Sequence, residues 1–284
     1  MTEKIRIKDL PPLREVIALH GLSARKSLGQ NFLLDLNILR RIARAAGPLV
    51  DKTVIEVGPG PGGLTRCLLE TSARHIVAVE HDPRCINAIR DLEYLAPDRL
   101  RIVEKDAMNL DLDVLEKEFG NLCIIANLPY NIATPLLIRW LKRIELFDGL
   151  FLMFQREVAE RIVAAPGSKI YGRLSVAAQW RCEVKPLFTL PARAFTPSPK
   201  IESTFVEFIP RKKRLAEAPS DAFETVVAAA FSQRRKMLRT SLKAIFSDPV
   251  SVLQEAGIDP TSRAEAIEIP GFCALARAFA SQVR

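Results

Sequence analysis

The chain has 284 residues, of which 48% are hydrophobic and 26% are charged, and its formal net charge is +8. This composition is typical of a packed globular protein with room for one large and one small domain, and it argues against a disordered chain. No apolar run reaches the roughly 18–20 residues of a membrane span, and the N-terminus lacks the apolar core of a secretory signal. We therefore expect a soluble, cytoplasmic protein that spans no membrane. The positive charge favours a polyanionic partner.

The cysteines and histidines predict no metal site. The five cysteines all lie more than four residues apart and the three histidines are equally scattered, so no zinc-knuckle spacing exists. We expect the cysteines to be small core residues in a reducing compartment.

The first half of the chain alternates between strand and helix patterns. Residues 1–30 are polar and irregular, and a helix pattern follows over 37–47. Short β-rich apolar runs then occupy 53–58, 75–82, 99–106, 122–128 and 150–155, with helical stretches at 62–72, 83–94, 111–119 and 132–143. This alternation predicts an α/β fold of the Rossmann-like type, with a mostly parallel sheet and helices on both of its faces.

The second half of the chain changes texture. A helix pattern over 171–182 is followed by two strand candidates, 184–190 and 203–209, which can add an antiparallel edge to the sheet. From about residue 215 the pattern is only helical, over 222–246, 250–257 and 271–282. We therefore divide the chain into an N-terminal arm, a large α/β domain and a small all-helical C-terminal domain. Their bounds are 1–25, 26–212 and 213–284.

A glycine-rich segment, residues 56–63 (EVGPGPGG), follows the first predicted strand. This crossover of an open α/β sheet is where nucleotide-like ligands bind. Gly58, Gly60 and Gly63 match the G-x-G-x-x-G pattern of dinucleotide sites. However, the intervening prolines remove backbone donors that would hold a pyrophosphate, and Glu56 would repel its oxygens. S-adenosylmethionine, a nucleoside with two cationic groups and no phosphate, fits better; a dinucleotide and a purely structural turn are the alternatives.

Two more acidic residues stand at the ends of the next strands. Glu80 ends the second strand, where a carboxylate can accept hydrogen bonds from both ribose hydroxyls. Asp106, followed by Ala107, ends the third strand, where an acid can accept from an adenine amine. Either acid alone is an ordinary solvated strand end, but together behind the glycine loop they favour the cofactor site.

Asn127-Leu128-Pro129-Tyr130 follows the fourth strand directly. The lone pair of an adenine amine is conjugated into the ring, so two acceptors on its hydrogens are needed to aim it at a methyl donor. The Asn127 side chain and the Leu128 carbonyl can supply them, Pro129 stiffens the turn, and Tyr130 offers a face for the base. The alternative is an ordinary strand-to-helix turn.

With these motifs, the sequence resembles the ribosomal RNA adenine dimethyltransferases, in particular the bacterial enzymes linked to kasugamycin resistance. Further matching stretches cover nearly the whole chain: Lys26-Ser27-Leu28-Gly29-Gln30-Asn31-Phe32-Leu33, Gln155-Arg156-Glu157-Val158, Tyr171-Gly172-Arg173-Leu174-Ser175, Phe195-Thr196-Pro197-Ser198-Pro199-Lys200 and Phe231-Ser232-Gln233-Arg234-Arg235-Lys236. The resemblance implies an S-adenosylmethionine-dependent enzyme that makes N6,N6-dimethyladenosine at two adjacent adenosines near the 3′ end of 16S rRNA in the 30S subunit. It also implies a role in small-subunit biogenesis, and we expect a monomer.

The resemblance also assigns residues. Gln30, Asn31 and Leu33 would cover the methionine end of the cofactor, and Gly58, Glu80, Asp106 and Asn127 would contact the rest. Our predicted cofactor-binding set also includes Glu56, Gly60 and Ala107. Phe195 is either a core anchor or, as the resemblance implies, a pocket residue that holds a flipped base against Tyr130.

A basic stretch completes the prediction. Between residues 211 and 243, nine Lys and Arg face three acids, which favours contact with RNA phosphates over a merely solvated helix face. The candidate RNA-binding residues are Arg234, Arg235, Lys236 and Arg239.

Three other functions remain open. A large-subunit rRNA adenine methyltransferase would share the motif at 127–130, although the helical tail and the segment 195–200 favour the small-subunit enzyme. A non-catalytic ribosome-assembly factor would keep the fold, but the intact acids and Asn127 argue for catalysis. A nicotinamide oxidoreductase is a more distant alternative.

Overall fold

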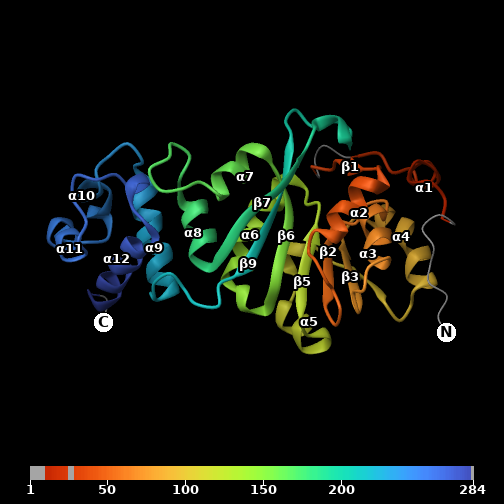
Figure 1. Ribbon diagram of the computed structural model, residues 1–284, viewed down its shortest axis with the longest axis horizontal. Coiled ribbons are helices and arrows are strands. Elements are labelled where there is room, and N and C mark those ends of the chain that lie inside the picture. The colour runs from red at the N-terminus through yellow and green to blue at the C-terminus, as the bar shows by residue number, and fades with distance from the viewer. Residues whose placement is uncertain (1–9, 25–28, 283–284) are drawn as a thin grey trace. The chain divides into compact units, whose positions relative to one another are not determined.

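The computed structural model describes residues 10–24 and 29–282 (Figure 1). The first nine residues of the predicted arm, and Arg25, Lys26, Ser27 and Leu28 of the segment around the predicted cofactor cover, lie outside the described residues. The chain groups into two compact units, Met1–Ala159 with Lys185–Pro210, and Glu160–Val184 with Arg211–Arg284. Within the described ranges, no helix is both long and apolar enough to cross a bilayer.

The first unit is built around a seven-stranded sheet with the order β4-β3-β2-β5-β6-β9-β7. Its strands are β2 (Thr53–Val57), β3 (His75–Glu80), β4 (Leu100–Glu104), β5 (Leu122–Ala126), β6 (Phe147–Gln155), β7 (Cys182–Leu190) and β9 (Ser203–Pro210). The first five strands of that order pair in parallel, and β9 pairs antiparallel with β6. The orange β2 therefore lies beside the yellow-green β5 in Figure 1. The predicted parallel sheet with an antiparallel addition is confirmed.

A helix precedes the first parallel strand, and further helices connect the parallel strands as the pattern predicted. They are α2 (Leu36–Arg44), α3 (Gly63–Leu69), α4 (Pro83–Leu95), α5 (Leu112–Phe119) and α6 (Tyr130–Lys142). Every residue of β2 and β5 is buried, as strands covered on both faces must be. Helix α6 begins two residues earlier than predicted, because the Pro129 carbonyl already accepts hydrogen bonds from the backbone N–H groups of Ile132 and Ala133.

The N-terminal segment is more ordered than the sequence suggested. Helix α1 (Leu13–Leu19) lies within the stretch predicted to be irregular. Its Leu13 and Val16 are buried, and Val16 joins Cys85 and Ala88 of α4 in a small apolar cluster. The expectation was wrong here because two apolar residues three positions apart form one helix face, a short signal that surrounding polar residues hide.

The second unit is helical and recruits a segment that we had placed in the domain 26–212. It contains α8 (Arg173–Arg181), α9 (Ser220–Ser232), α10 (Leu238–Ser241), α11 (Pro249–Glu255) and α12 (Ile269–Gln282), while α7 (Arg156–Ile162) crosses the boundary between the units. Trp180 of α8 is fully buried and stacks on Phe223 of α9 with ring centroids 3.8 Å apart. Aromatic packing therefore ties 160–184 to the C-terminal helices. The functional roles of the arm and the two domains stay predictions.

One predicted helix is broken. The stretch 222–246 was expected to be continuous, but α9 ends at Ser232 and α10 begins at Leu238. The five residues between them are all exposed, whereas Leu238 is fully buried. A polar run with no apolar stripe gains nothing from tertiary packing, so the helix is not propagated through it.

Candidate active site

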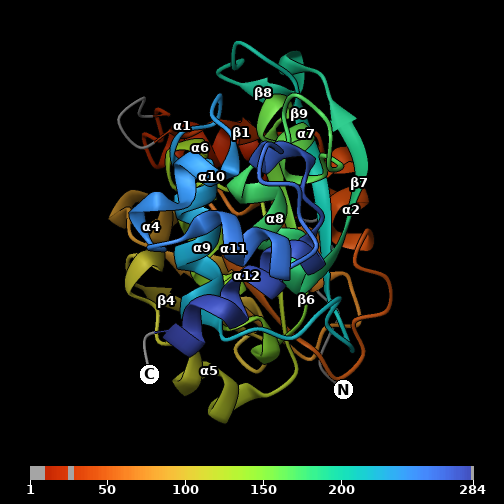
Figure 2. The same cartoon turned by 90° about the vertical axis from the view of Figure 1, so that its left-hand side faces the viewer.

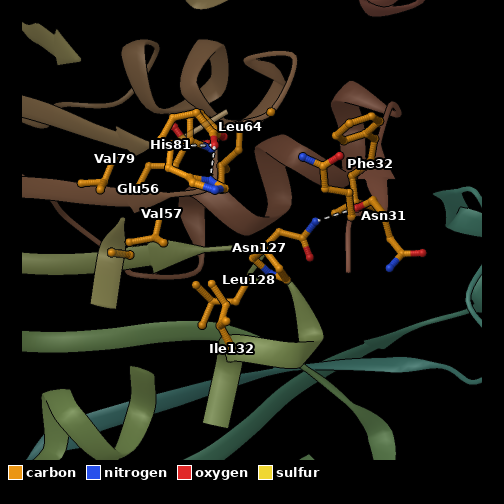
Figure 3. Close-up of a pocket in the computed structure, with 18 of the residues that line it drawn as sticks. Asn31, Phe32, Glu56, Val57, Leu64, Val79, His81, Asn127, Leu128 and Ile132 are labelled. Carbon is orange, nitrogen blue, oxygen red and sulfur yellow. Dashed lines mark hydrogen bonds and ion pairs between the residues drawn. The ribbon is translucent and has the colours of Figure 1, made fainter. Parts of the chain in front are cut away.

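A cavity of about 240 Å³ lies in the first unit at the carboxyl ends of the central parallel strands (Figure 3). All ten predicted cofactor-binding residues line it: Gln30, Asn31, Leu33, Glu56, Gly58, Gly60, Glu80, Asp106, Ala107 and Asn127. Leu128 and Tyr130 line it as well. Five segments that are far apart in the sequence therefore meet at one place, which is the position where open α/β sheets bind their ligands.

The glycine loop approaches the cavity without side chains of its own. Gly58 and Gly60 adopt left-handed backbone angles, with φ of +70° and +55°. A Cβ on Gly60 would lie 3.1 Å from the Phe32 ring. The loop therefore packs directly against the segment that precedes α2, and at this position only glycine leaves enough room for the Phe32 ring.

Glu56 is the most unusual group of the site. It is the second-to-last residue of β2 and has 1% of its surface exposed, and within the described part of the chain no group donates a hydrogen bond to its Oε2 atom. Burial raises the pKa of Glu56 to about 8, and the nearby Glu80 carboxylate acts in the same direction. A buried carboxylate oxygen without a donor indicates a place for a cationic or hydrogen-bond-donating ligand group.

Glu80 and Asp106 are held by their own turns. The Glu80 Oε1 atom accepts hydrogen bonds from the backbone N–H groups of His81 (2.8 Å) and Asp82 (2.9 Å). Asp106 Oδ1 likewise accepts from the N–H of Met108 at 2.8 Å. One oxygen of each carboxylate is thus fixed by backbone donors, and among the described residues the second oxygen accepts no hydrogen bond.

The Asn127 amide has one orientation. Its Nδ2 atom donates to the Asn31 carbonyl at 3.2 Å, and Figure 3 shows the two residues reaching toward each other across the cavity. Asn31 in turn donates to the Gly29 carbonyl, also at 3.2 Å. Because the nitrogen is used in this way, the Asn127 Oδ1 atom remains as an acceptor for a ligand.

Tyr130 is anchored from the other side of the site. Its hydroxyl group lies 2.5 Å from the Oγ atom of Ser203, a fully buried residue at the start of β9. The antiparallel pairing of β9 with β6 places Ser203 opposite Gln155. Burial raises the pKa of Tyr130, so its phenol stays protonated at neutral pH and is unsuited to act as a base.

Phe195 does not join the cavity lining. Its side chain is 3% exposed and belongs to the main hydrophobic core. Strand β8 (Phe195–Thr196) pairs antiparallel with β1 (Phe32–Leu33), which sets Phe195 opposite Leu33. Pairing with β1 turns the side chain into the core, and the predicted role of Phe195 beside the target base stays a prediction.

The four basic candidates of the second unit do not share one environment. Arg234 forms an ion pair with Glu265 at 3.1 Å and donates to the carbonyls of Lys169 and Tyr171. It therefore holds its own unit together, since these acceptors occupy its guanidinium. Arg235, Lys236 and Arg239 are exposed and stay candidates for phosphate contact.

Several lining residues were not predicted. Phe32, His81, Lys105 and Asn131 all face the cavity. Each is a neighbour of a predicted residue at a strand end or in a turn, so the only available signal was proximity to the motifs. Ser203 was missed because its contact with Tyr130 is made across 73 positions of sequence.

Comparison with known proteins agrees with this geometry. The family model described as "Ribosomal RNA adenine dimethylase" matches residues 21–281. A protein named "Ribosomal RNA small subunit methyltransferase A" from Rhodospirillum rubrum is 56% identical over 269 residues, which cover 95% of this chain and 92% of the relative. A protein of the same name from a Bradyrhizobium strain is 57% identical over 278 residues, 95% of both chains.

Solved structures show the same fold. A dimethyladenosine transferase from Plasmodium falciparum has a TM-score of 0.75 at 25% identity, over 88% of this chain and 97% of that one. The 23S rRNA methyltransferase ErmE has a TM-score of 0.66 at 24% identity, over 88% and 100%. Because the family model spans nearly the whole chain, and the relatives are more than half identical over nearly their full length, the chain belongs to the ribosomal RNA adenine dimethylase family.

Proposed function

We propose that this chain transfers methyl groups from S-adenosylmethionine to the N6 atoms of two adjacent adenosines near the 3′ end of 16S rRNA in the 30S subunit. The observation that carries the proposal is the fixed Asn127 amide, whose oxygen is left to accept a hydrogen bond at the cavity. The name of the relatives, small subunit methyltransferases, supports the choice of subunit. In this proposal the enzyme acts in the cytoplasm as a monomer, in ribosome biogenesis.

The residues of the cavity fit this cofactor. When bound, S-adenosylmethionine supplies an electrophilic methyl group on its sulfonium. The donorless Glu56 oxygen suits the cationic end of the methionine moiety, the second oxygen of Glu80 suits the ribose hydroxyls, and that of Asp106 suits the adenine amine. Gln30, Asn31 and Leu33 line the same cavity and would cover the methionine end. A sulfonium is already a good leaving group, so the proposal needs no metal.

The target amine is oriented by two acceptors. Asn127 Oδ1 and the Leu128 carbonyl accept hydrogen bonds from its two N–H groups. These bonds turn the nitrogen lone pair out of conjugation with the ring and toward the methyl group. The Tyr130 ring stacks against the base, and its protonated phenol leaves the released proton to water. After the first transfer the amine retains one hydrogen, so one acceptor still orients it for the second.

The decisive experiment is methyl transfer to 30S particles that lack the modification, with the product nucleotide identified by mass spectrometry and mapped by primer extension. We expect two adjacent N6,N6-dimethyladenosines near the 3′ end. Methylation of 50S particles would instead identify a large-subunit enzyme, and the absence of any transfer would favour an assembly factor without catalysis.

Replacing Asn127 should separate binding from catalysis. Asn127→Ala removes the acceptor for the amine, so we expect kcat for methyl transfer to fall by about 100-fold or more. The affinity for S-adenosylhomocysteine, measured by calorimetry, should fall much less than kcat, because the other nine predicted cofactor-binding residues still line the cavity. The control is Asn87→Ala on the exposed face of α4, which should keep full activity. Undiminished turnover in the Asn127 variant would overturn the mechanism.

The Glu56 pKa predicts a pH-dependent affinity. At neutral pH the ligand-free carboxyl is largely protonated, since its pKa is about 8, yet it must be ionised to pair with a cation. S-adenosylhomocysteine should therefore bind more tightly as pH rises from 6 to 7.5, by up to about tenfold per pH unit. Calorimetry in two buffers of different ionisation enthalpy should show proton release.

Glu56→Gln should weaken this binding and abolish its pH dependence. The pKa of Glu56 is higher in the folded state than in the unfolded chain. Its contribution to the stability of the ligand-free fold is therefore complete below the unfolded-state pKa and is lost as pH rises through about 8. The melting temperature of ligand-free Glu56→Gln should therefore exceed that of the wild type more at pH 9 than at pH 6. Glu104→Gln, at the exposed end of β4, is the matched control. An unchanged pH profile in Glu56→Gln would refute the assignment.

The hydroxyl pair of Tyr130 and Ser203 should act as one unit. Ser203→Ala and Tyr130→Phe each remove the same hydrogen bond, so each should lower kcat about fivefold, the equivalent of about 1 kcal/mol. The double variant should lose no more than either single one. Ser198→Ala, in an exposed loop, is the control. Additive losses would show that Ser203 does not position Tyr130.

A further inference from the structure

A second hollow lies in the first unit and shares no lining residue with the cavity. Its walls are α2 and the segment of β7 around Leu187 and Phe188, and Figure 2 shows these two elements side by side. The residues that line it are Asn37, Arg40, Arg41, Arg44, Ala45, Leu187 and Phe188. We call this surface the α2 groove. It combines three arginines and an aromatic ring with no acidic lining residue, and neither the proposed chemistry nor the basic C-terminal stretch uses it.

The arginines of the groove differ in how they are held. Arg40 pairs with Glu70 at 3.1 Å, outside the lining residues. The Arg41 guanidinium lies over the Phe188 ring at 4.0 Å from its centroid. Stacking fixes the plane of this guanidinium and leaves its N–H groups at the edge, which is the geometry suited to bidentate contact with a phosphate.

The charges of Arg41 and Arg44 are not neutralised within the structure. Both side chains are exposed, and among the described residues neither forms an ion pair with a carboxylate. As the basic residues in the last turn of α2, they also interact favourably with the negative end of the helix dipole. That role requires only charge, however, and does not account for a stacked guanidinium in a groove that lacks acids.

The α2 groove lies close to the proposed reaction centre. Leu39 of α2 lines the cavity, whereas the adjacent Arg40 lines the groove. The two sites therefore occupy different faces of one helix, separated by about one helix diameter, roughly 10 Å. A polyanion whose adenine enters the cavity has backbone within reach of this face.

We propose that the α2 groove is a second RNA-binding surface, on the catalytic unit itself, where Arg41 and Arg44 contact phosphates of the substrate RNA and Phe188 supports the contact. It rests on the proposed function, because the RNA would be the one whose adenosines are methylated. The partner is identified by charge and by the stacked guanidinium, which suit a phosphodiester backbone better than the carboxylates of a protein surface.

The test compares Arg41→Gln/Arg44→Gln with Arg74→Gln/Arg90→Gln, a control that removes the same charge from exposed positions of the same unit outside the groove. The probes are a synthetic RNA hairpin with the 3′-terminal sequence of 16S rRNA and unmethylated 30S particles. We expect the groove variant to bind both about tenfold more weakly. The slope of log K against the logarithm of the salt concentration should be smaller in magnitude by about two. KM should rise while kcat and the affinity for S-adenosylhomocysteine stay unchanged.

Each other outcome is decisive. Equal effects of the two double variants would show only general electrostatics and would overturn the proposal. Weaker binding to 30S particles with unchanged binding to the hairpin would indicate a protein partner and would also overturn it. If the double variant is destabilised, Arg44→Glu, a single exposed change, must still weaken RNA binding. Failure of the wild type to methylate 30S particles would instead refute the proposed function, whereas hairpin binding would still report on the groove.

Discussion

The hydrogen bond from Asn127 to the Asn31 carbonyl is the interaction on which the site depends. It joins two residues that are 96 positions apart and ties the end of β5 to the segment that leads into β1. The same bond occupies the Asn127 nitrogen, so the amide oxygen stays available as the acceptor that the proposed mechanism requires. One hydrogen bond therefore both joins two walls of the cavity and sets the orientation of the Asn127 amide.

Glu56 shows what this arrangement costs. A carboxyl that is buried beside another carboxylate, with an oxygen that lacks a donor, destabilises the ligand-free fold when it is ionised. A cationic or hydrogen-bond-donating ligand group at this oxygen would offset that cost. The ionised Glu56 carboxylate thus lowers the stability of the ligand-free fold and favours ligand binding, a trade-off that is common at functional sites.

The sequence predicted those features that follow from local patterns. The alternation of strands and helices led to the parallel sheet, and polar residues at strand ends led to the cavity, because parallel strands carry their ends to one edge. Packing between residues that are distant in the sequence could not be predicted from local patterns. The stack of Trp180 on Phe223, which joins 160–184 to the C-terminal helices, and the ion pair of Arg234 with Glu265 leave no periodic trace in the sequence.

The placement of Phe195 shows that likeness to a family does not predict how a side chain packs. The stretch 195–200 matches the family, yet in this structure its first residue pairs with β1 and is buried in the core. Strand β1 includes Phe32, whose ring packs against the glycine loop, and Leu33, which lines the cavity. Phe195 thus packs behind the strand whose residues line the cavity, while Ser203, eight positions later, contacts Tyr130. The segment 195–203 therefore supports the cavity wall through backbone pairing and one hydroxyl, and a contact between Phe195 and the target base stays a prediction.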